Sequence, residues 1–292
     1  MNLYQGPLRW LPLALIAIAM LELYILHRRG RAFDWRESLT SLFISIGQRI
    51  AGLLAAALFA GVYWYVWEHR LFTVPLNTWW GITLLFLGQE FFYYWEHRLS
   101  HESRWFWASH MVHHSANFLN LSAAYRLSWT APFTGQNLFF LPLVYCGFSP
   151  LAVLAMLALN LLYQFWLHTE LVPRLGWFDR IFNSPSNHRV HHASNVAYLD
   201  ANYGGILIIF DRLFGTYIPE RSEEPCKFGL VHPLRSNNPF HIVFYEWRNL
   251  WRDLRQAQTW SQRWGFLLKA PGWKPGGGGS TTKELRGAVK IP

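Results

Sequence analysis

Long apolar runs restrict this chain to a helical membrane fold. They cover residues 10–26, 42–67, 79–95, 133–148 and 151–166, and a helix of about 20 residues crosses a bilayer. Lipid offers no partner to backbone polar groups, so a spanning segment must be a helix or part of a closed barrel. Only 15% of the residues are charged, against about 25% in a soluble domain. We therefore predict an all-α, polytopic membrane bundle.

The loops between these runs predict an orientation. Four arginines lie between the first two runs, at positions 28, 29, 31 and 36. The positive-inside rule places this loop in the cytoplasm and the N-terminus outside. Gly147 and Pro150 separate the last two runs and predict a helical hairpin that either spans the bilayer or re-enters it. We therefore predict about five transmembrane helices and a cytoplasmic C-terminus.

Differences in charge and composition along the sequence predict four segments. We predict N-terminal transmembrane helices over 1–70, a catalytic domain over 71–218, cytosolic or interfacial helices over 219–270 and a flexible, glycine-rich tail over 271–292. The net charge of +9 falls mainly beside apolar runs, which favours contact with lipid headgroups over nucleic acid. Cys146 and Cys226 form no CxxC pair and do not predict a disulfide framework.

Histidines cluster in three short motifs that share one expected location. On a helix, residues at i, i+3 and i+4 lie on one face, so each motif should direct its imidazoles one way. The predicted topology puts all three motifs on the cytoplasmic side, together with a further histidine that ends the fifth run. The motifs are His97-x-x-x-His101, His110-x-x-His113-His114 and His188-x-x-His191-His192, and the further histidine is His168.

Nine imidazoles exceed what one tetrahedral ion needs, so we predict two metal ions. Imidazole suits iron, zinc, copper and nickel, whereas calcium and magnesium prefer oxygen ligands. A metal-bound histidine usually donates its second N–H to a carboxylate or carbonyl group. By spacing, we expect Glu90, Glu102 and Asp200 in that supporting role. We predict no catalytic residues beyond the metal ligands.

Simpler interpretations apply to some of these residues. His27, His69, His232 and His241 stand alone, and we expect them to contact headgroups or solvent. The three motifs together could form a pH-sensitive or adventitious metal-binding surface. The coincidence of three helical-face patterns on one side of the membrane argues against that interpretation.

The motifs resemble those of the fatty acid hydroxylase / sterol desaturase superfamily. The short gap between His101 and His110 is similar to that superfamily and shorter than in acyl-CoA desaturases. Within it, the chain looks most like the alkylglycerol monooxygenase-like members. The segments that carry this resemblance are 94–98 (YWEHR), 107–115 (WASHMVHHS), 164–170 (QFWLHTE) and 183–192 (NSPSNHRVHH).

This resemblance implies a di-iron site built by the nine histidines and oxygen-dependent hydroxylation of a lipid. It also implies a separate electron donor, which would be cytochrome b5, ferredoxin or tetrahydrobiopterin. Two alternatives stay open. A sterol or fatty-acyl desaturase would use the same iron site, because both reactions begin with hydrogen abstraction. A histidine-rich metal transporter or sensor belongs to another class and predicts ligands spread through the membrane interior.

Overall fold

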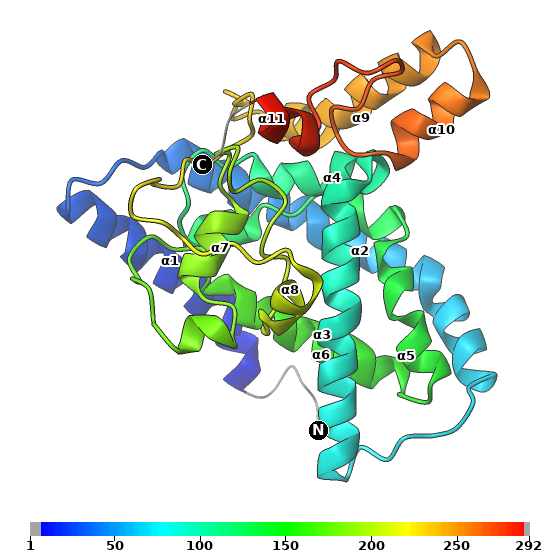
Figure 1. Cartoon of the computed structure of the whole chain (residues 1–292). Helices are drawn as coiled ribbons and strands as arrows, with labels where there is room; N and C mark the ends of the chain where they lie inside the picture. Colours follow the sequence, from blue (N-terminus) through cyan, green and yellow to red (C-terminus); the bar gives the residue numbers. More distant parts are fainter. Residues whose placement is uncertain (1–6, 289–292) are drawn as a thin grey trace.

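The computed structural model describes residues 7–288, and over that range it contains helices and no strand (Figure 1). The all-α prediction is therefore confirmed. The α-helices are α1 (Leu11–Arg28), α2 (Trp35–Glu68), α3 (Trp79–Glu102), α4 (Arg104–His114), α5 (Leu141–Tyr145), α6 (Pro150–Phe165), α7 (Pro185–His191), α8 (Ile209–Phe214), α9 (Pro239–Gln256), α10 (Trp260–Leu268) and α11 (Thr282–Ala288). The 3-10 helices are η2 (Pro7–Trp10), η3 (Leu121–Tyr125), η4 (Ala131–Phe133), η5 (Gln136–Phe140) and η6 (Phe178–Arg180).

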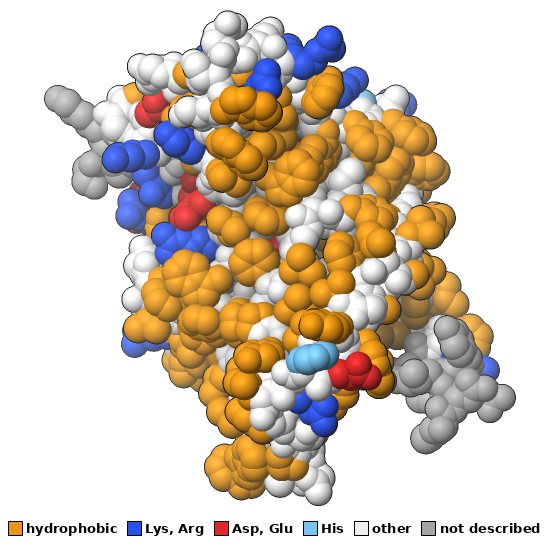
Figure 2. Space-filling model, turned by 90° about the vertical axis from the view of Figure 1, so that its right-hand side faces the viewer, with side chains coloured by type: hydrophobic (Ala, Val, Ile, Leu, Met, Phe, Trp, Pro, Cys, Tyr) orange, Lys and Arg blue, Asp and Glu red, His pale blue; other side chains and the backbone are white. Residues whose placement is uncertain are grey.

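Helices α1 and α2 are long and apolar enough to cross a membrane, with mean hydropathies of 1.6 and 1.8. Most of their side chains face outward, because only 22% and 17% of the respective windows are buried. Hydrophobic side chains also cover most of the face in Figure 2, whereas charged side chains gather in its upper part and in a small group near its lower end. Such a surface suits lipid and supports an integral membrane protein.

Helix α3 connects the apolar part of the molecule to the histidine-rich part. It begins at Thr78, whose hydroxyl accepts from Gly81 N, and it continues past the predicted end at residue 95 to Glu102. Inside it, the Glu90 carboxylate is buried and accepts backbone hydrogen bonds from Ile206 (2.7 Å) and Leu207 (2.8 Å). Glu90 thus faces the protein interior, as the cost of a carboxylate in lipid requires.

The predicted hairpin at 133–166 is regular in only one of its arms. Helix α6 forms the second arm, whereas the first divides into η4, η5 and the short α5. Pro132, Gly135 and Pro142 explain the division, because proline removes a helical hydrogen bond and Gly135 has φ of 93°. The turn before α6 lies beside the α2–α3 connection, where Leu71 N donates to Tyr145 O at 2.8 Å.

Helices α4, α9 and α10 form a layer over the upper end of α3 (Figure 1). Arg104, at the start of α4, holds this layer through ion pairs to Glu246 and Asp253, both at 2.7 Å. Both acids lie on α9, and they share one face because they are seven residues apart. Arg104 N also donates to Lys269 O at 3.0 Å, directly after α10.

The segment predicted as a flexible tail has defined contacts up to residue 288. Trp273 packs against Phe266 of α10, with ring centroids 5.4 Å apart. The segment ends in α11, where the Arg286 guanidinium donates to Leu199 O and Val196 O. Its glycines allow the turn that returns it to the protein, because Gly272 and Gly276 both have φ of 83°.

Asp211 organises the backbone that follows α7. It is fully buried, and its carboxylate accepts from Tyr203 N (2.7 Å), Gly204 N (2.8 Å) and the Thr216 hydroxyl (2.7 Å). The backbone of residues 203–216 therefore closes around one side chain. A loss of that side chain leaves buried donors without an acceptor.

We predict that Asp211→Ala lowers the free energy of unfolding by about 2–4 kcal/mol, because it strands two buried N–H groups and a hydroxyl. Thermal unfolding of the detergent-purified chain measures this. Glu223→Ala is the matched control, because Glu223 is exposed and should change stability by no more than about 0.5 kcal/mol. Equal melting temperatures for the two variants would contradict the role of Asp211.

Candidate metal centre

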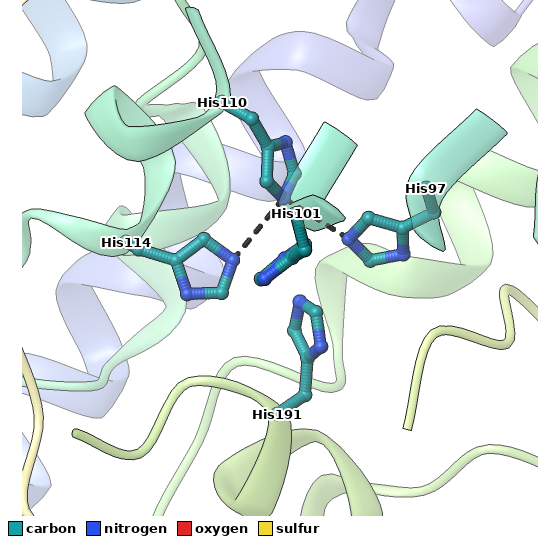
Figure 3. A group of neighbouring side chains, drawn as sticks. All are labelled: His97, His101, His110, His114 and His191. Carbon is teal, nitrogen blue, oxygen red and sulfur yellow. Dashed lines mark hydrogen bonds between the residues drawn. The ribbon is translucent and has the colours of Figure 1, made fainter. Parts of the chain in front are cut away.

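The structure brings the nine predicted histidines into two neighbouring groups. In each group, one ring nitrogen per residue lies within 4.8 Å of all the others. Figure 3 shows the first group, with five rings turned toward a common centre. The five-histidine group contains His97, His101, His110, His114 and His191, and the four-histidine group contains His113, His168, His188 and His192.

The sequence pattern suggests that each HxxHH motif directs all of its imidazoles to one group. In the structure, the histidines of each HxxHH motif are divided between the two groups. In α4, His110 and His114 join the five-histidine group, whereas His113 joins the four-histidine group. In the third motif the division is reversed: His191 joins the five-histidine group, and His188 and His192 join the other. The i, i+4 pairs stay together because they lie on one helical face, and the remaining residue of each motif belongs to the other group.

This crossed division places the two groups in contact. The rings of His114 and His192 stack with centroids 4.4 Å apart, and those of His188 and His191 stack with centroids 5.2 Å apart. Two ions bound by the groups would therefore be close neighbours, as in sites where two metals act on one substrate.

Distances between the ring nitrogens fit metal coordination. His110 Nε2 lies 3.1 Å from both His97 Nε2 and His114 Nε2. In the other group, His168 Nε2 lies 3.1 Å from His113 Nε2 and 3.0 Å from His188 Nε2. Two nitrogens bound at right angles to one ion, each at about 2.1 Å, would be about 3.0 Å apart.

Burial favours the neutral form of most of these imidazoles. It lowers the pKa of His168 to about 4. Burial and then the neighbouring histidines also lower the pKa of the other rings of α4 and α7 well below the ordinary value of 6.5. These rings are His110, His113, His114, His188, His191 and His192. A neutral ring has one N–H and one lone pair, and the lone pair is what a metal binds.

Backbone carbonyls fix which nitrogen keeps the proton in three rings. His168 Nδ1 donates to Gln164 O (2.9 Å) and His191 Nδ1 to Ala201 O (3.0 Å). His97 Nδ1 donates to Tyr203 O (2.8 Å). Each Nε2 then carries a lone pair directed at its group.

Hydrogen bonds among the rings cannot satisfy all of these lone pairs. The Nε2 atoms of His101 and His191 are buried with no hydrogen-bond partner. Converging lone pairs in a dry interior are unfavourable without a cation, because a buried acceptor without a donor costs about 1–3 kcal/mol. The donor set therefore fits one transition-metal ion in each group.

The three acids expected to support the histidines lie at different distances from them. Asp200 Oδ1 is 3.4 Å from His101 Nδ1. Glu102 pairs with Arg98, whose Nε is 2.8 Å from Glu102 Oε1. Glu90 bonds Asn160 and the backbone at 206–207, so it lies one layer farther out. The supporting role of all three stays a prediction.

Arg189 is a site residue that the motif analysis did not single out. It lies inside the third motif, and its guanidinium donates to both carboxylate oxygens of Glu220 at 2.7 Å and to Val172 O at 2.8 Å. Burial raises the pKa of Glu220, but the bonds and charge of Arg189 lower it further, so Glu220 is ionised at neutral pH. The pair anchors α7 to the segments at residues 172 and 220, and only the position of Arg189 among the histidines could have signalled this.

A cavity of about 660 Å³ reaches both groups of histidines. His101, His114 and His191 of one group and His192 of the other line it. Its outer walls come from α9, α10 and the 271–285 segment, with aromatic side chains that include Trp107, Tyr245, Phe266 and Trp273. A molecule in this cavity would lie next to both groups, which is the arrangement that joint chemistry requires.

The isolated histidines belong to neither group. His27 and His69 are exposed, and His241 contacts the Ser236 hydroxyl through Nδ1 at 3.2 Å. His232 is exposed at the border of the cavity. Their expected role as surface residues fits these positions.

Comparison with known proteins places this site in a family. Residues 82–216 match the fatty acid hydroxylase family model. The chain is 38% identical to alkylglycerol monooxygenase of Xenopus tropicalis over 250 residues, which are 85% of this chain and 55% of that protein. It is 38% identical to the Homo sapiens protein of the same name over 89% of this chain and 58% of that protein. Ornithine lipid hydroxylase OlsE of Rhizobium tropici is 34% identical over 129 residues, which are 44% of this chain and 39% of that protein.

The chain spans just over half the length of the alkylglycerol monooxygenases that it matches. No solved structure matches it. The matched range 82–216 contains all nine histidines of the two groups, so the family match and the site coincide. Residues 82–216 thus match a fatty acid hydroxylase domain, and over most of its length the chain is similar to the alkylglycerol monooxygenases.

Proposed function

We propose that this chain is a membrane-bound, non-haem di-iron oxygenase that hydroxylates a C–H bond of a lipid with O2 and an external reductant. The convergence of nine imidazoles in two adjacent groups carries this proposal. The names of its relatives support a lipid substrate, because they include an alkylglycerol monooxygenase and an ornithine lipid hydroxylase.

Iron is the metal that suits both the ligands and the reaction. Imidazole binds iron, zinc and copper, but zinc has no redox chemistry. Iron, when bound, would supply the electron transfers that activate O2. One ion would be held by His97, His101, His110, His114 and His191, and the other by His113, His168, His188 and His192.

The protein's own residues would orient the metal ligands, keep water away from the site and position the substrate. Carbonyl acceptors at Gln164, Ala201 and Tyr203 keep the Nε2 lone pairs directed inward. The buried rings exclude water, which limits side reactions of activated oxygen. The cavity beside both groups would position the lipid carbon, and its aromatic walls would contact the apolar part of the lipid.

The enclosed position of the histidines disfavours a metal transporter. A transporter needs binding sites along a route through the membrane. Here the imidazoles gather at the end of α3, in α4 and around α7, away from the apolar middle of α1 and α2. Desaturation differs from hydroxylation only in the final step, so the product distinguishes the two.

The orientation that we propose places the histidine groups and the C-terminus in the cytoplasm. The arginine-rich connection between α1 and α2 would lie on that side, and the 71–74 and 145–147 turns, which hydrogen-bond to each other, would lie on the opposite side. Besides α1 and α2, we propose that α3, the region around α5 and α6 also enter the bilayer, which gives about five segments. A separate cytochrome b5, ferredoxin or tetrahydrobiopterin would deliver electrons from the cytoplasm.

We predict that the purified full chain contains about two iron ions per chain. His113→Ala and His191→Ala, which each remove a ligand from a different group, should lower iron content and reduce oxygenation by more than about 100-fold. Elemental analysis of the detergent-purified protein measures the metal. His69→Ala is the matched control, because His69 is exposed and lies outside both groups. Active protein without a transition metal would refute the proposal.

The reaction is tested by lipid mass spectrometry. Membranes that contain the chain should, with oxygen and a reductant, produce a lipid that has gained one oxygen atom. Ether lipids, sterols, hopanoids and fatty acyl chains should be compared, with each class of donor supplied in turn. Membranes with the His113→Ala variant and oxygen-free incubations should lack the product. A product that has instead lost two hydrogens would identify a desaturase.

The two free cysteines allow a test of orientation. Cys146 is exposed at the turn before α6, so a membrane-impermeant maleimide should label it in intact cells when Cys226 is replaced by Ser. A second protein with Cys146→Ser, Cys226→Ser and Glu223→Cys should be labelled only after permeabilisation, because residue 223 lies on the histidine side of the molecule. The opposite pattern would contradict the orientation, and labelling of both in intact cells would contradict the separation of the two sides.

A further inference from the structure

One four-residue segment serves three histidines of the same group. Residues 200–203 follow α7, and three acceptors in this segment face Nδ1 atoms of the five-histidine group. The contacts are Asp200 Oδ1 to His101 (3.4 Å), Ala201 O to His191 (3.0 Å) and Tyr203 O to His97 (2.8 Å). The group's members from α3 and α7 are therefore oriented by a single loop.

The backbone of this segment is unusual. Asp200 has φ of 52° and Asn202 has φ of 58°, and these are the only non-glycine residues with positive φ in residues 7–288. Such conformations cost about 1–3 kcal/mol, although Asp and Asn tolerate them best. The two left-handed residues flank Ala201, so the chain reverses direction around the carbonyl that faces His191.

Surrounding contacts hold the segment in this conformation. The Asn202 side chain donates to Asn187 O (3.0 Å) and Ile218 O (2.8 Å) and accepts from Ile218 N (2.9 Å). Asp211 accepts from Tyr203 N at 2.7 Å. A strained loop that such contacts hold in place is a preorganised set of acceptors, because no reorganisation is needed when the histidines bind a cation.

The four-histidine group has no comparable support. Only His168 makes a hydrogen bond of normal geometry from Nδ1 to a carbonyl, at Gln164 O. The Nδ1 atom of His188 is buried without a hydrogen-bond partner, and His113 has a backbone contact with Arg126 that does not meet hydrogen-bond geometry. Within the described part of the chain, the contact between Asp200 and His101 is the one ion pair that involves any of the nine histidines, so no carboxylate pairs with this group.

We propose that the two metal sites are unequal, and that the 200–203 segment, with the Asp200 carboxylate as its one charged acceptor, makes the five-histidine site the tighter. This rests on the proposed di-metal centre. A partner on Nδ1 fixes the tautomer and raises the basicity of the ligating nitrogen. A nearby carboxylate also attracts the cation. The five-histidine site fills first, and the four-histidine site fills second and loses its ion first.

The test is an anaerobic calorimetric titration of the metal-free full chain, in detergent, with ferrous iron. We expect two binding phases whose dissociation constants differ by at least about tenfold, which is the effect of one supporting partner. His168→Ala removes a ligand of the four-histidine group, so it should abolish the weaker phase and leave the tighter one. This result would assign the weaker binding phase to the four-histidine group and the tighter phase to the five-histidine group.

Two substitutions of Asp200 then test the positioning role. Asp200→Gly keeps the backbone conformation, because glycine adopts positive φ freely, but it removes the carboxylate. It should weaken the tighter phase by about 10–100-fold and leave the weaker phase unchanged. Asp200→Asn keeps an oxygen acceptor without the charge, so it should retain part of the lost affinity. A general loss of folding would weaken both phases and lower the melting temperature of the metal-free protein.

Glu223→Gln is the control. It removes one negative charge at an exposed position outside both groups. The tighter phase of this variant should equal that of the unmodified chain. The inference would be overturned by equal affinities for the two ions, by an unchanged tighter phase in Asp200→Gly, or by an equal effect of Glu223→Gln, and each of these results would leave the di-metal centre standing. Absence of iron binding in the unmodified chain would overturn the proposed function itself.

Discussion

The constraint on which this structure depends is the meeting of neutral imidazole lone pairs in a dry interior. Burial lowers the pKa of most of the rings, and hydrogen bonds among them leave the Nε2 atoms of His101 and His191 without partners. A bound cation would satisfy these converging lone pairs and so stabilise the fold. The remaining polar groups of the interior can be understood as the means by which nine rings from four parts of the chain are kept in place.

Those polar groups act on the backbone as much as on the rings. Glu90 binds the backbone at 206–207, Asp211 closes the backbone of 203–216, and Arg189 anchors α7 through Glu220. Each buried charge is matched by several donors or acceptors, which is the condition under which buried charge is tolerated. Together they surround the histidines with a rigid layer, and this layer begins inside α3, the helix that leads from the apolar region to the site.

The apolar region and the histidine site are joined by the same helix. The apolar surfaces of α1 and α2 face outward, and α3 carries His97 and His101 on its last turns. The cavity lies beside the rings and is bounded by α9, α10 and the 271–285 segment. Within that segment, Trp273 packs against Phe266 and Arg286 donates to Leu199 O, contacts that composition does not reveal.

The sequence by itself determined the all-helical class, the apolar helices and the nine histidines, because hydropathy and the helical period are local properties. It also predicted that the motifs would meet, since each ends or follows a helix on one side of the membrane. Only the tertiary structure decided how they are divided: His113 and His191 cross to the group opposite their own motif. It likewise decided that Pro132, Gly135 and Pro142 break the first hairpin arm, and that Asp200, Ala201 and Tyr203 face three distant rings. These outcomes depend on which segments pack against one another and on two left-handed residues in a loop, and no local periodicity encodes either.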